Sequence, residues 1–186
     1  MTQDTHSTPA GTLTREQGLQ ALDQAARAAQ TAGQPLAVLT LDLDHFKAWS
    51  DGVDAGRAAQ AIAAVGSLLA AEAGAHASHL GGDEFMQIMP GTDLSAALAT
   101  AERLRDAIAG ALAHFDALPP LTATLGVAAA PAGTPWSGTA LLSLADARMT
   151  FAKKRLEPHH NLAYGGALPS DWYTRLDIDP QKWPTA

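Results

Sequence analysis

Two short apolar runs, 75–80 and 85–90, are separated only by the four residues 81–84, Gly-Gly-Asp-Glu. A connection this short that begins with two glycines is typical of a β-hairpin, because glycine adopts the positive φ angles that tight turns require. This segment therefore predicts two strands joined by an acidic, glycine-rich tip. Any fold assigned to the chain must place that tip where its charges are solvated or neutralised.

The rest of the sequence alternates helical and strand patterns. Residues 36–43 are apolar almost throughout, which favours a strand covered on both faces. Thr14 and Gln17 form a capping box, and Gly33 is a typical helix stop, so they predict a helix at about 14–32. The other predicted elements are helices at 56–74, 92–115 (capped by Thr92 or Asp93) and 137–156, a strand at 121–130 and a short last strand within 159–166. This order predicts an α+β fold in which helices surround a central, mainly antiparallel sheet.

The chain of 186 residues is long enough for one domain with its own core. Residues 1–12 are predicted to be a flexible N-terminal tail, residues 13–164 the domain, and residues 165–186 a C-terminal tail. Trp172 and Trp183 lie in that last segment, which we expect to pack across the domain surface or a partner.

Composition excludes several classes of function. The chain contains no cysteine, which rules out disulfides, thiolate metal sites and cysteine nucleophiles. Its formal net charge of −7 disfavours a general nucleic-acid-binding protein. No stretch approaches the ~20 apolar residues of a membrane span, and the polar start lacks the features of a signal peptide. We therefore expect a soluble cytoplasmic protein that binds neither nucleic acid nor membranes.

Acidic residues also end the 36–43 strand. Asp42 and Asp44 lie two residues apart, so the period of a strand places both on the same face. Charges at the end of a buried strand are costly unless they are solvated, paired or bound to a metal. Directly afterwards, His45, Phe46 and Lys47 offer backbone N–H groups and a cation, which suit a phosphate.

The hairpin tip supplies a second acidic pair, Asp83 and Glu84. If the hairpin lies beside the Asp42 strand, three or four carboxylates converge and require a divalent cation, and oxygen ligands favour Mg²⁺ or Mn²⁺. Carboxylates, such an ion and a lysine are typical of phosphoryl or nucleotidyl transfer. Either acidic motif alone is also common in ordinary turns and strand ends, whereas their combination about forty residues apart favours function.

These motifs resemble the GGDEF domain of diguanylate cyclases. Phe85 completes the Gly-Gly-Asp-Glu-Phe signature, and residues 42–47 (DLDHFK) match the family's Asp-x-Asp-x-Phe-Lys strand. Residues 118–130 (LPPLTATLGVAAA) are similar to its Thr-x-Ser-x-Gly-Val-Ala strand, and residues 144–154 (LADARMTFAKK) to its terminal helix. The resemblance spans about residues 13–164. It implies a palm-like nucleotide-cyclase fold in which two domains, each holding one GTP, face each other and produce cyclic di-GMP and two pyrophosphates.

The resemblance also implies residue roles by position. Asp42, the Leu43 carbonyl and Asp83 would bind Mg²⁺ or Mn²⁺, with Glu84 supporting that site. Asp83 would also help to deprotonate the attacking 3′-hydroxyl, so Asp83 and Glu84 are the candidate catalytic residues. The implied substrate-binding residues are the backbone of His45 and Phe46, with Lys47 and Lys153, at the phosphates, Gly82 along the nucleotide and Ser50 at the base-reading position.

The positions that would read the base depart from the family pattern. Ser50 replaces an asparagine, and Arg57 stands where an aspartate would accept from guanine. Arginine cannot accept a hydrogen bond, and serine offers one hydroxyl in place of a two-ended amide. Asp54 could substitute for the missing acid.

Two further departures concern the phosphates and product inhibition. Glu157 fills the place of a phosphate-binding arginine, for which Arg155 or Lys154 could substitute. Glu72 and Ala75 occupy the Arg-x-x-Asp motif that binds cyclic di-GMP in the family, so we expect no feedback binding there.

Some residues fit more than one interpretation. Trp49 could stack on a purine or pack in the core. The pair His159-His160 could bind a metal or be ordinary exposed loop histidines. Arg103 and Arg105 fit a solvated helix face.

The sequence thus favours a Mg²⁺-dependent, homodimeric diguanylate cyclase that acts on GTP or another purine nucleotide, with a separate regulatory protein as a further partner. Two alternatives remain because the base-reading positions are degenerate. One is an inactive domain that acts as a nucleotide sensor or protein-interaction module. The other is a cyclase with altered purine specificity.

Overall fold

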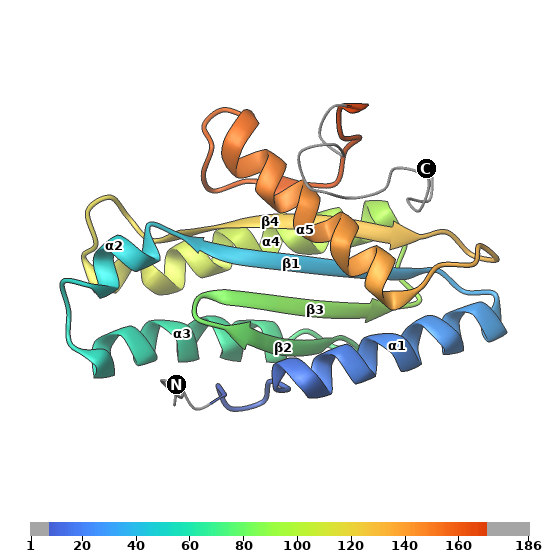
Figure 1. Ribbon diagram of the computed structural model, residues 1–186. Coiled ribbons are helices and arrows are strands. Elements are labelled where there is room, and N and C mark those ends of the chain that lie inside the picture. Colours follow the sequence, from blue (N-terminus) through green and yellow to red (C-terminus); the bar gives the residue numbers. More distant parts are fainter. Residues whose placement is uncertain (1–7, 171–186) are drawn as a thin grey trace, which may run out of the picture.

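The computed structural model describes residues 8–170, which form a sheet with helices on both faces (Figure 1). The helices are α1 (Arg15–Ala32), α2 (Phe46–Ser50), α3 (Ala55–Ala70), α4 (Leu94–Leu112) and α5 (Gly138–Arg155), with a 3-10 turn η1 (Ala113–Phe115) after α4. The strands are β1 (Leu36–Asp44), β2 (His76–Gly81), β3 (Glu84–Pro90), β4 (Thr122–Ala130) and β5 (Ala163–Tyr164). The predicted α+β fold is confirmed. None of the described helices is both long and apolar enough to cross a bilayer.

The five strands lie in the order β2-β3-β1-β4-β5. All neighbours are antiparallel except β4 and β5, which are parallel. Strand β1 is central, with β3 on one side and β4 on the other, and helices cover both faces, so its apolar run is buried as predicted. The predicted hairpin is confirmed as β2 and β3, and its tip lies at the same edge as the end of β1.

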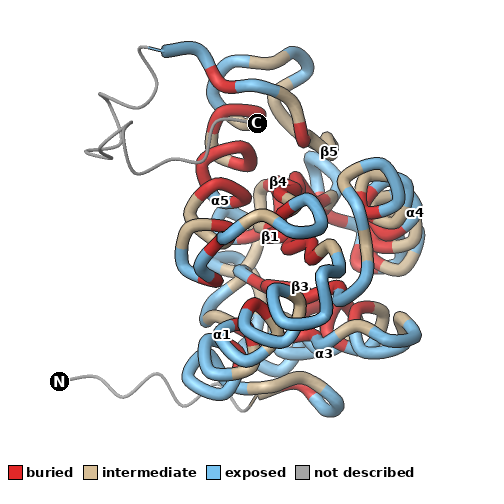
Figure 2. The backbone as a smooth tube through the Cα atoms, turned by 90° about the vertical axis from the view of Figure 1, so that its right-hand side faces the viewer, coloured by how far each residue is buried: buried red, intermediate tan, exposed pale blue. Residues whose placement is uncertain are grey.

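The two faces of the sheet carry separate apolar clusters. Leu39, Leu41 and Leu43 of β1 pack with α3 and α4, whereas Val38 packs with α1 and α5. Figure 2 shows the same layering end-on, with the buried strands between the two helix pairs. Because strand side chains alternate, Asp42 and Asp44 continue the row of Val38 on the α1 and α5 face.

Local signals define the helix ends. Thr14 and Gln17 form the predicted capping box on α1, and Gly33 ends that helix in the left-handed conformation with φ 61°. Asp93, not Thr92, caps α4 by accepting a hydrogen bond from the Ala96 N–H at 2.8 Å. These caps satisfy terminal N–H and C=O groups that would otherwise lack partners.

Two helix predictions differ from the structure. Helix α3 ends at Ala70 rather than at the predicted residue 74, because the chain reverses between these positions and Gly74 has φ 75°. Helix α2 was not predicted, since its five residues are too few to show a helical period. It begins after His45, whose φ of 64° turns the chain sharply as it leaves β1.

Both ends of the described chain pack on the domain. Of the predicted N-terminal tail, residues 8–12 are described, and Pro9 is buried. A Cβ on Gly66 of α3 would lie 2.5 Å from the Pro9 Cβ, so the two segments are in close contact. Leu168, in the predicted C-terminal tail, is 9% exposed and joins the cluster of α1 and α5. Trp172 and Trp183 lie outside the described residues.

Candidate functional site

Three carboxylates meet at one edge of the sheet. The β1–β3 register places Asp42 directly opposite Glu84, and side chains opposite each other in an antiparallel pair share a face. Asp83 precedes Glu84 in the turn, where Gly82 has φ 57°. Asp42, Asp83 and Glu84 therefore lie near one another at this end of the sheet.

The pKa values of the Asp83 and Glu84 carboxyl groups at this edge are raised. Partial burial, followed by the negative charge of Asp42, raises the pKa of Asp83 from 3.8 to about 6. Partial burial and the charges of Asp42 and then Asp146 raise the pKa of Glu84. Ionisation of Asp83 and Glu84 is therefore disfavoured first by their partial burial and then by the neighbouring carboxylates.

Asp146 on α5 is a fourth carboxylate near this edge, and the sequence analysis missed it. Together with Glu84 and Thr40 it lines a cavity of about 320 Å³ between α1, α5 and the sheet. Partial burial and the charge of Asp42 raise the pKa of Asp146. Its position within residues 144–154, which resemble the family's terminal helix, was the only available signal.

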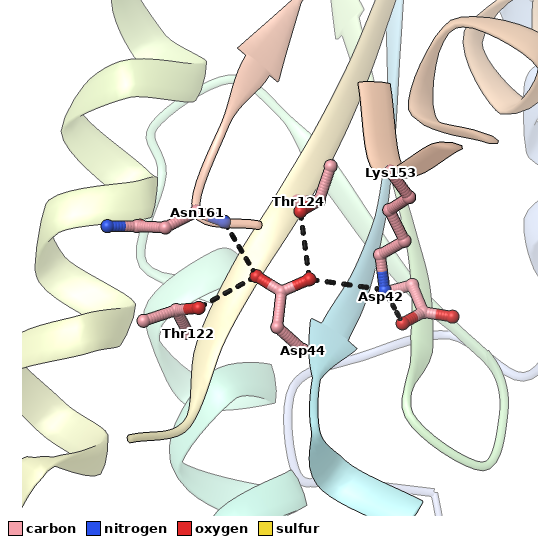
Figure 3. Close-up of polar contacts among 6 residues, drawn as sticks. All are labelled: Asp42, Asp44, Thr122, Thr124, Lys153 and Asn161. Carbon is pink, nitrogen blue, oxygen red and sulfur yellow. Dashed lines mark hydrogen bonds and ion pairs between the residues drawn. The ribbon is translucent and has the colours of Figure 1, made fainter. Parts of the chain in front are cut away.

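Asp44, although on the same face as Asp42, belongs to a buried hydrogen-bond network (Figure 3). Its carboxylate accepts hydrogen bonds from the Thr122 hydroxyl at 2.7 Å, the Thr124 hydroxyl at 2.8 Å and the Asn161 backbone N–H at 2.8 Å. An acid at the end of a buried strand can be solvated, paired or bound to a metal, and Asp44 is accommodated by pairing with these donors. It joins β1 to β4 and to the loop after α5.

Lys153 extends from α5 between the two aspartates (Figure 3). Its Nζ forms an ion pair with Asp42 and a second with Asp44, where the Nζ–Oδ1 distance is 3.2 Å. In the protein alone, the lysine is thus the counter-ion of the Asp42 carboxylate.

The donors at this edge fit a hard divalent cation, because Asp42, Asp83 and Glu84 supply carboxylate oxygens. Among residues 8–170, no three acidic or histidine side chains are arranged around one point that could hold a metal ion.

The expected phosphate-binding residues lie just beyond β1. His45 is the N-terminal cap of α2, and the His45 ring stacks on His160 with centroids 4.2 Å apart. Phe46 is buried in the core, so only its backbone can serve a ligand. Lys47 is exposed, and its Nζ lies 3.1 Å from Asp51.

The residues predicted at the base-reading positions make hydrogen bonds within the protein. The Ser50 hydroxyl donates to the Lys47 carbonyl at 3.1 Å. The Arg57 guanidinium donates to the Phe115 carbonyl at 2.9 Å, and Asp54 accepts from the Arg57 N–H as the cap of α3. Trp49 packs against the rings of Phe46 and Phe115, which matches the core alternative for this residue.

Comparison with known proteins identifies the family. A model of the diguanylate cyclase GGDEF domain matches residues 11–158. The chain belongs to the GGDEF domain family. The family predicted from the sequence motifs is therefore confirmed.

Relatives of this GGDEF domain are found in sequence and in structure. The response regulator PleD of Caulobacter vibrioides is 34% identical over 137 residues, which cover 71% of this chain and 30% of PleD. The chain thus spans less than a third of that relative. The GGDEF domain of DgcB from Caulobacter crescentus, in complex with c-di-GMP, has a TM-score of 0.73 at 26% identity and covers 89% of this chain and 96% of that one. SiaD from Pseudomonas aeruginosa, in complex with its activator SiaC, has a TM-score of 0.71 at 21% identity and covers 82% of this chain and 58% of that one; this likeness concerns the fold alone.

Other residues that depart from the GGDEF pattern form pairs at the surface. Glu157 lies 2.9 Å from the His159 Nε2. Glu72 pairs with Arg103 at 2.6 Å. Arg105 pairs with Glu102 and Asp106 of its own helix, but its side chain is only 20% exposed, whereas that of Arg103 is 58% exposed and fits the predicted solvated face.

Proposed function

We propose that this GGDEF domain is a metal-dependent nucleotidyl transferase of the diguanylate cyclase type. It converts two GTP into cyclic di-GMP and two pyrophosphates, with one GTP held by each subunit of a homodimer. The observation that carries the proposal is the joint placement of Asp42, Asp83 and Glu84 at one sheet edge, beside Lys153. DgcB, whose GGDEF domain has this fold, binds c-di-GMP.

Asp42, the Leu43 carbonyl, Asp83 and Glu84 would hold Mg²⁺ or Mn²⁺. When bound, the ion polarises the α-phosphate and neutralises charge that develops there. The Asp83 carboxylate accepts the proton of the 3′-hydroxyl, since a base with a pKa of about 6 is mostly ionised at neutral pH and still attracts a proton. The 3′-oxygen then forms a bond to the partner's α-phosphorus, and the bond to pyrophosphate breaks.

The remaining residues position the nucleotide. Lys153 and Lys47 neutralise the phosphates, together with the backbone of His45 and Phe46 as the chain enters α2. A Cβ atom on Gly82 would have no other protein atom within 4 Å, so that side of the tip is open for the nucleotide.

Mass spectrometry tests the proposal directly. Purified protein is incubated with GTP, with ATP and with both, in the presence of Mg²⁺ or Mn²⁺. We expect cyclic di-GMP, and we expect Asp83→Ala to reduce product formation by about 100-fold or more, as for loss of a general base. Absence of product from every nucleotide, combined with unchanged nucleotide affinity in Asp83→Ala, would refute the proposal.

One specific observation favours two other candidates. These are a nucleotide sensor and a cyclase with altered purine specificity. Arg57 and Asp54, at the base-reading end, are bonded to Phe115 and to α3. Arg57 offers no acceptor to the guanine N–H groups, and one of the two Asp54 carboxylate oxygens already accepts from the Arg57 N–H. Calorimetry with GTP and ATP separates the cases: tight binding without turnover supports the sensor, and preference for ATP supports altered specificity. A separate regulatory protein remains a prediction from the sequence.

A further inference from the structure

The two aspartates bound by Lys153 differ in how they are held. The Asp44 side chain is 0% exposed and keeps three hydrogen bonds from β4 and the 161 backbone regardless of the lysine. The Asp42 side chain is 25% exposed and lies at the open edge beside Glu84. Lys153 therefore has one fixed partner, Asp44, and one partner from which it can separate (Figure 3).

The position of Lys153 conflicts with cation binding at Asp42. An ammonium group in contact with a carboxylate repels a divalent ion at the same oxygens. The Lys153 side chain is 23% exposed, and ion pairs that water reaches are weak enough to exchange. A triphosphate offers the lysine a replacement partner with several negative charges.

We propose that Lys153 is an exchangeable counter-ion that controls access of the divalent cation to Asp42. In the free domain, Lys153 holds Asp42 and opposes cation binding. When a triphosphate arrives, the Lys153 amine turns from Asp42 to the phosphates while it stays beside Asp44, and Asp42 is released to the cation. Nucleotide and cation therefore bind cooperatively through this chain's own lysine, and the effect is reciprocal. The role of the nucleotide rests on the proposed function, whereas competition at Asp42 does not.

A simpler role for Lys153 would be structural. The ion pairs join α5 to β1, so the lysine could only hold the helix on the sheet and orient Asp42. The two roles predict opposite effects on metal affinity when the lysine charge is removed. A competitor, once removed, leaves the cation bound more tightly, whereas an orienting residue, once removed, leaves it bound more weakly or unchanged.

The test measures Mn²⁺ binding without nucleotide, by the electron paramagnetic resonance signal of free Mn²⁺. We expect Lys153→Met, which keeps the length of the side chain, to bind Mn²⁺ roughly five- to tenfold more tightly than the unaltered protein. Lys154→Met is the matched control, because it removes an exposed lysine one position along the same helix, and its affinity should change less than about twofold. Lys153→Arg keeps the charge and should resemble the unaltered protein. Affinity in a folded Lys153→Met that is unchanged or weaker would overturn the proposal.

A second measurement needs no variant. Lysine acetylation of the unaltered protein, read by peptide mass spectrometry, should label Lys153 several-fold faster with saturating Mn²⁺ than with chelator, whereas Lys154 should not change. Equal labelling of Lys153 in both conditions would also overturn the proposal. Both measurements are independent of turnover. Failure to make cyclic di-GMP therefore counts against the proposed function alone, and product formation with unchanged Mn²⁺ affinity counts against the lysine exchange alone.

Discussion

Asp42 and Asp44 show how the environment divides two identical residues on one strand face. Asp44 lies beside β4, and two threonine hydroxyls and a backbone N–H donate hydrogen bonds to its carboxylate. Asp42 lies opposite Glu84, where the hairpin adds negative charge instead of donors. The Asp44 carboxylate is therefore held by three donors within the fold, whereas the Asp42 carboxylate has Lys153 as its partner and lies beside the other acids.

The pH dependence of the free energy of unfolding should reveal that ionisation of Asp83 is unfavourable in the folded protein. The pKa of this carboxyl is raised from 3.8 to about 6, so the folded state binds its proton more tightly than the unfolded state does. The free energy of unfolding therefore falls as pH rises through this window, and ionised Asp83 destabilises the metal-free protein above it. We expect Asp83→Asn to raise the free energy of unfolding by about 1 kcal/mol at about pH 7.5 in chelator, and to lose this advantage below about pH 4.

Urea unfolding at several pH values measures this effect. Asp23→Asn is a suitable control, because Asp23 is 56% exposed on α1 and far along the chain from the acidic edge. A gain in Asp83→Asn that is equally large at low pH would show that repulsion between carboxylates is not its cause.

Sequence and structure agree best at this scale where a residue's role depends on local pattern. Asp42, Asp83 and Glu84 could be predicted, because strand period and hairpin length bring them together. The partners of Asp44 could not, since Thr122 lies 78 and Asn161 lies 117 residues away in the chain. Asp146 was missed because a single acid on a helix carries no pattern that indicates what it faces.

At the scale of elements, the packing of α5 on β4 sets where Lys153 lies. A Cβ on Gly126 would lie 2.0 Å from the Ala145 carbonyl oxygen and 2.5 Å from the Met149 nitrogen, which are backbone atoms of α5. Only a residue without a side chain lets the helix approach this closely. The position matches the glycine of the family-like strand motif, so its identity was predictable although its neighbour was not.

Replacing Gly126 should disturb both stability and the site. Gly126→Ala must push α5 from the sheet, so we expect the free energy of unfolding to fall by about 2–3 kcal/mol and affinity for pyrophosphate to decrease as Lys153 moves. Gly110→Ala on α4 is the control, since its Cβ would meet nothing within 4 Å and should be neutral or stabilising. Denaturant unfolding and calorimetry measure both effects, and equal stability of the two variants would contradict the packing argument.

Element boundaries were predictable where side chains mark them. Helix α1 is defined by Thr14, Gln17 and Gly33. Helix α2 depends on the left-handed turn at His45, which no periodic pattern of apolar residues in the sequence predicts. The end of α3 likewise depends on how the chain must turn to enter β2.

At the scale of the whole molecule, charge opposes the assembly that the proposed reaction needs. Each chain carries a formal net charge of −7, and the acidic edges would have to face each other across the dimer. Bringing such edges together without cations is unfavourable, and the penalty is strongest at low salt. In the proposed dimer, bound divalent cations would offset part of this negative charge, whereas the nucleotide is itself an anion and would instead add contacts between the two subunits.

The assembly state should therefore depend on ligand. We expect sedimentation velocity at low salt to show a monomer in chelator and a dimer with a non-hydrolysable GTP analogue and Mg²⁺, because the nucleotide would then contact both subunits and the metal ions would offset part of the charge of Asp42, Asp83 and Glu84. The analogue with chelator tests whether the nucleotide alone suffices, and Asp42→Ala, which removes a proposed metal ligand, should stay monomeric with both ligands. A dimer that forms in chelator at low salt would show that contacts away from the acidic edge drive association. A monomer at saturating analogue and Mg²⁺ would argue against a shared active site and favour the sensor.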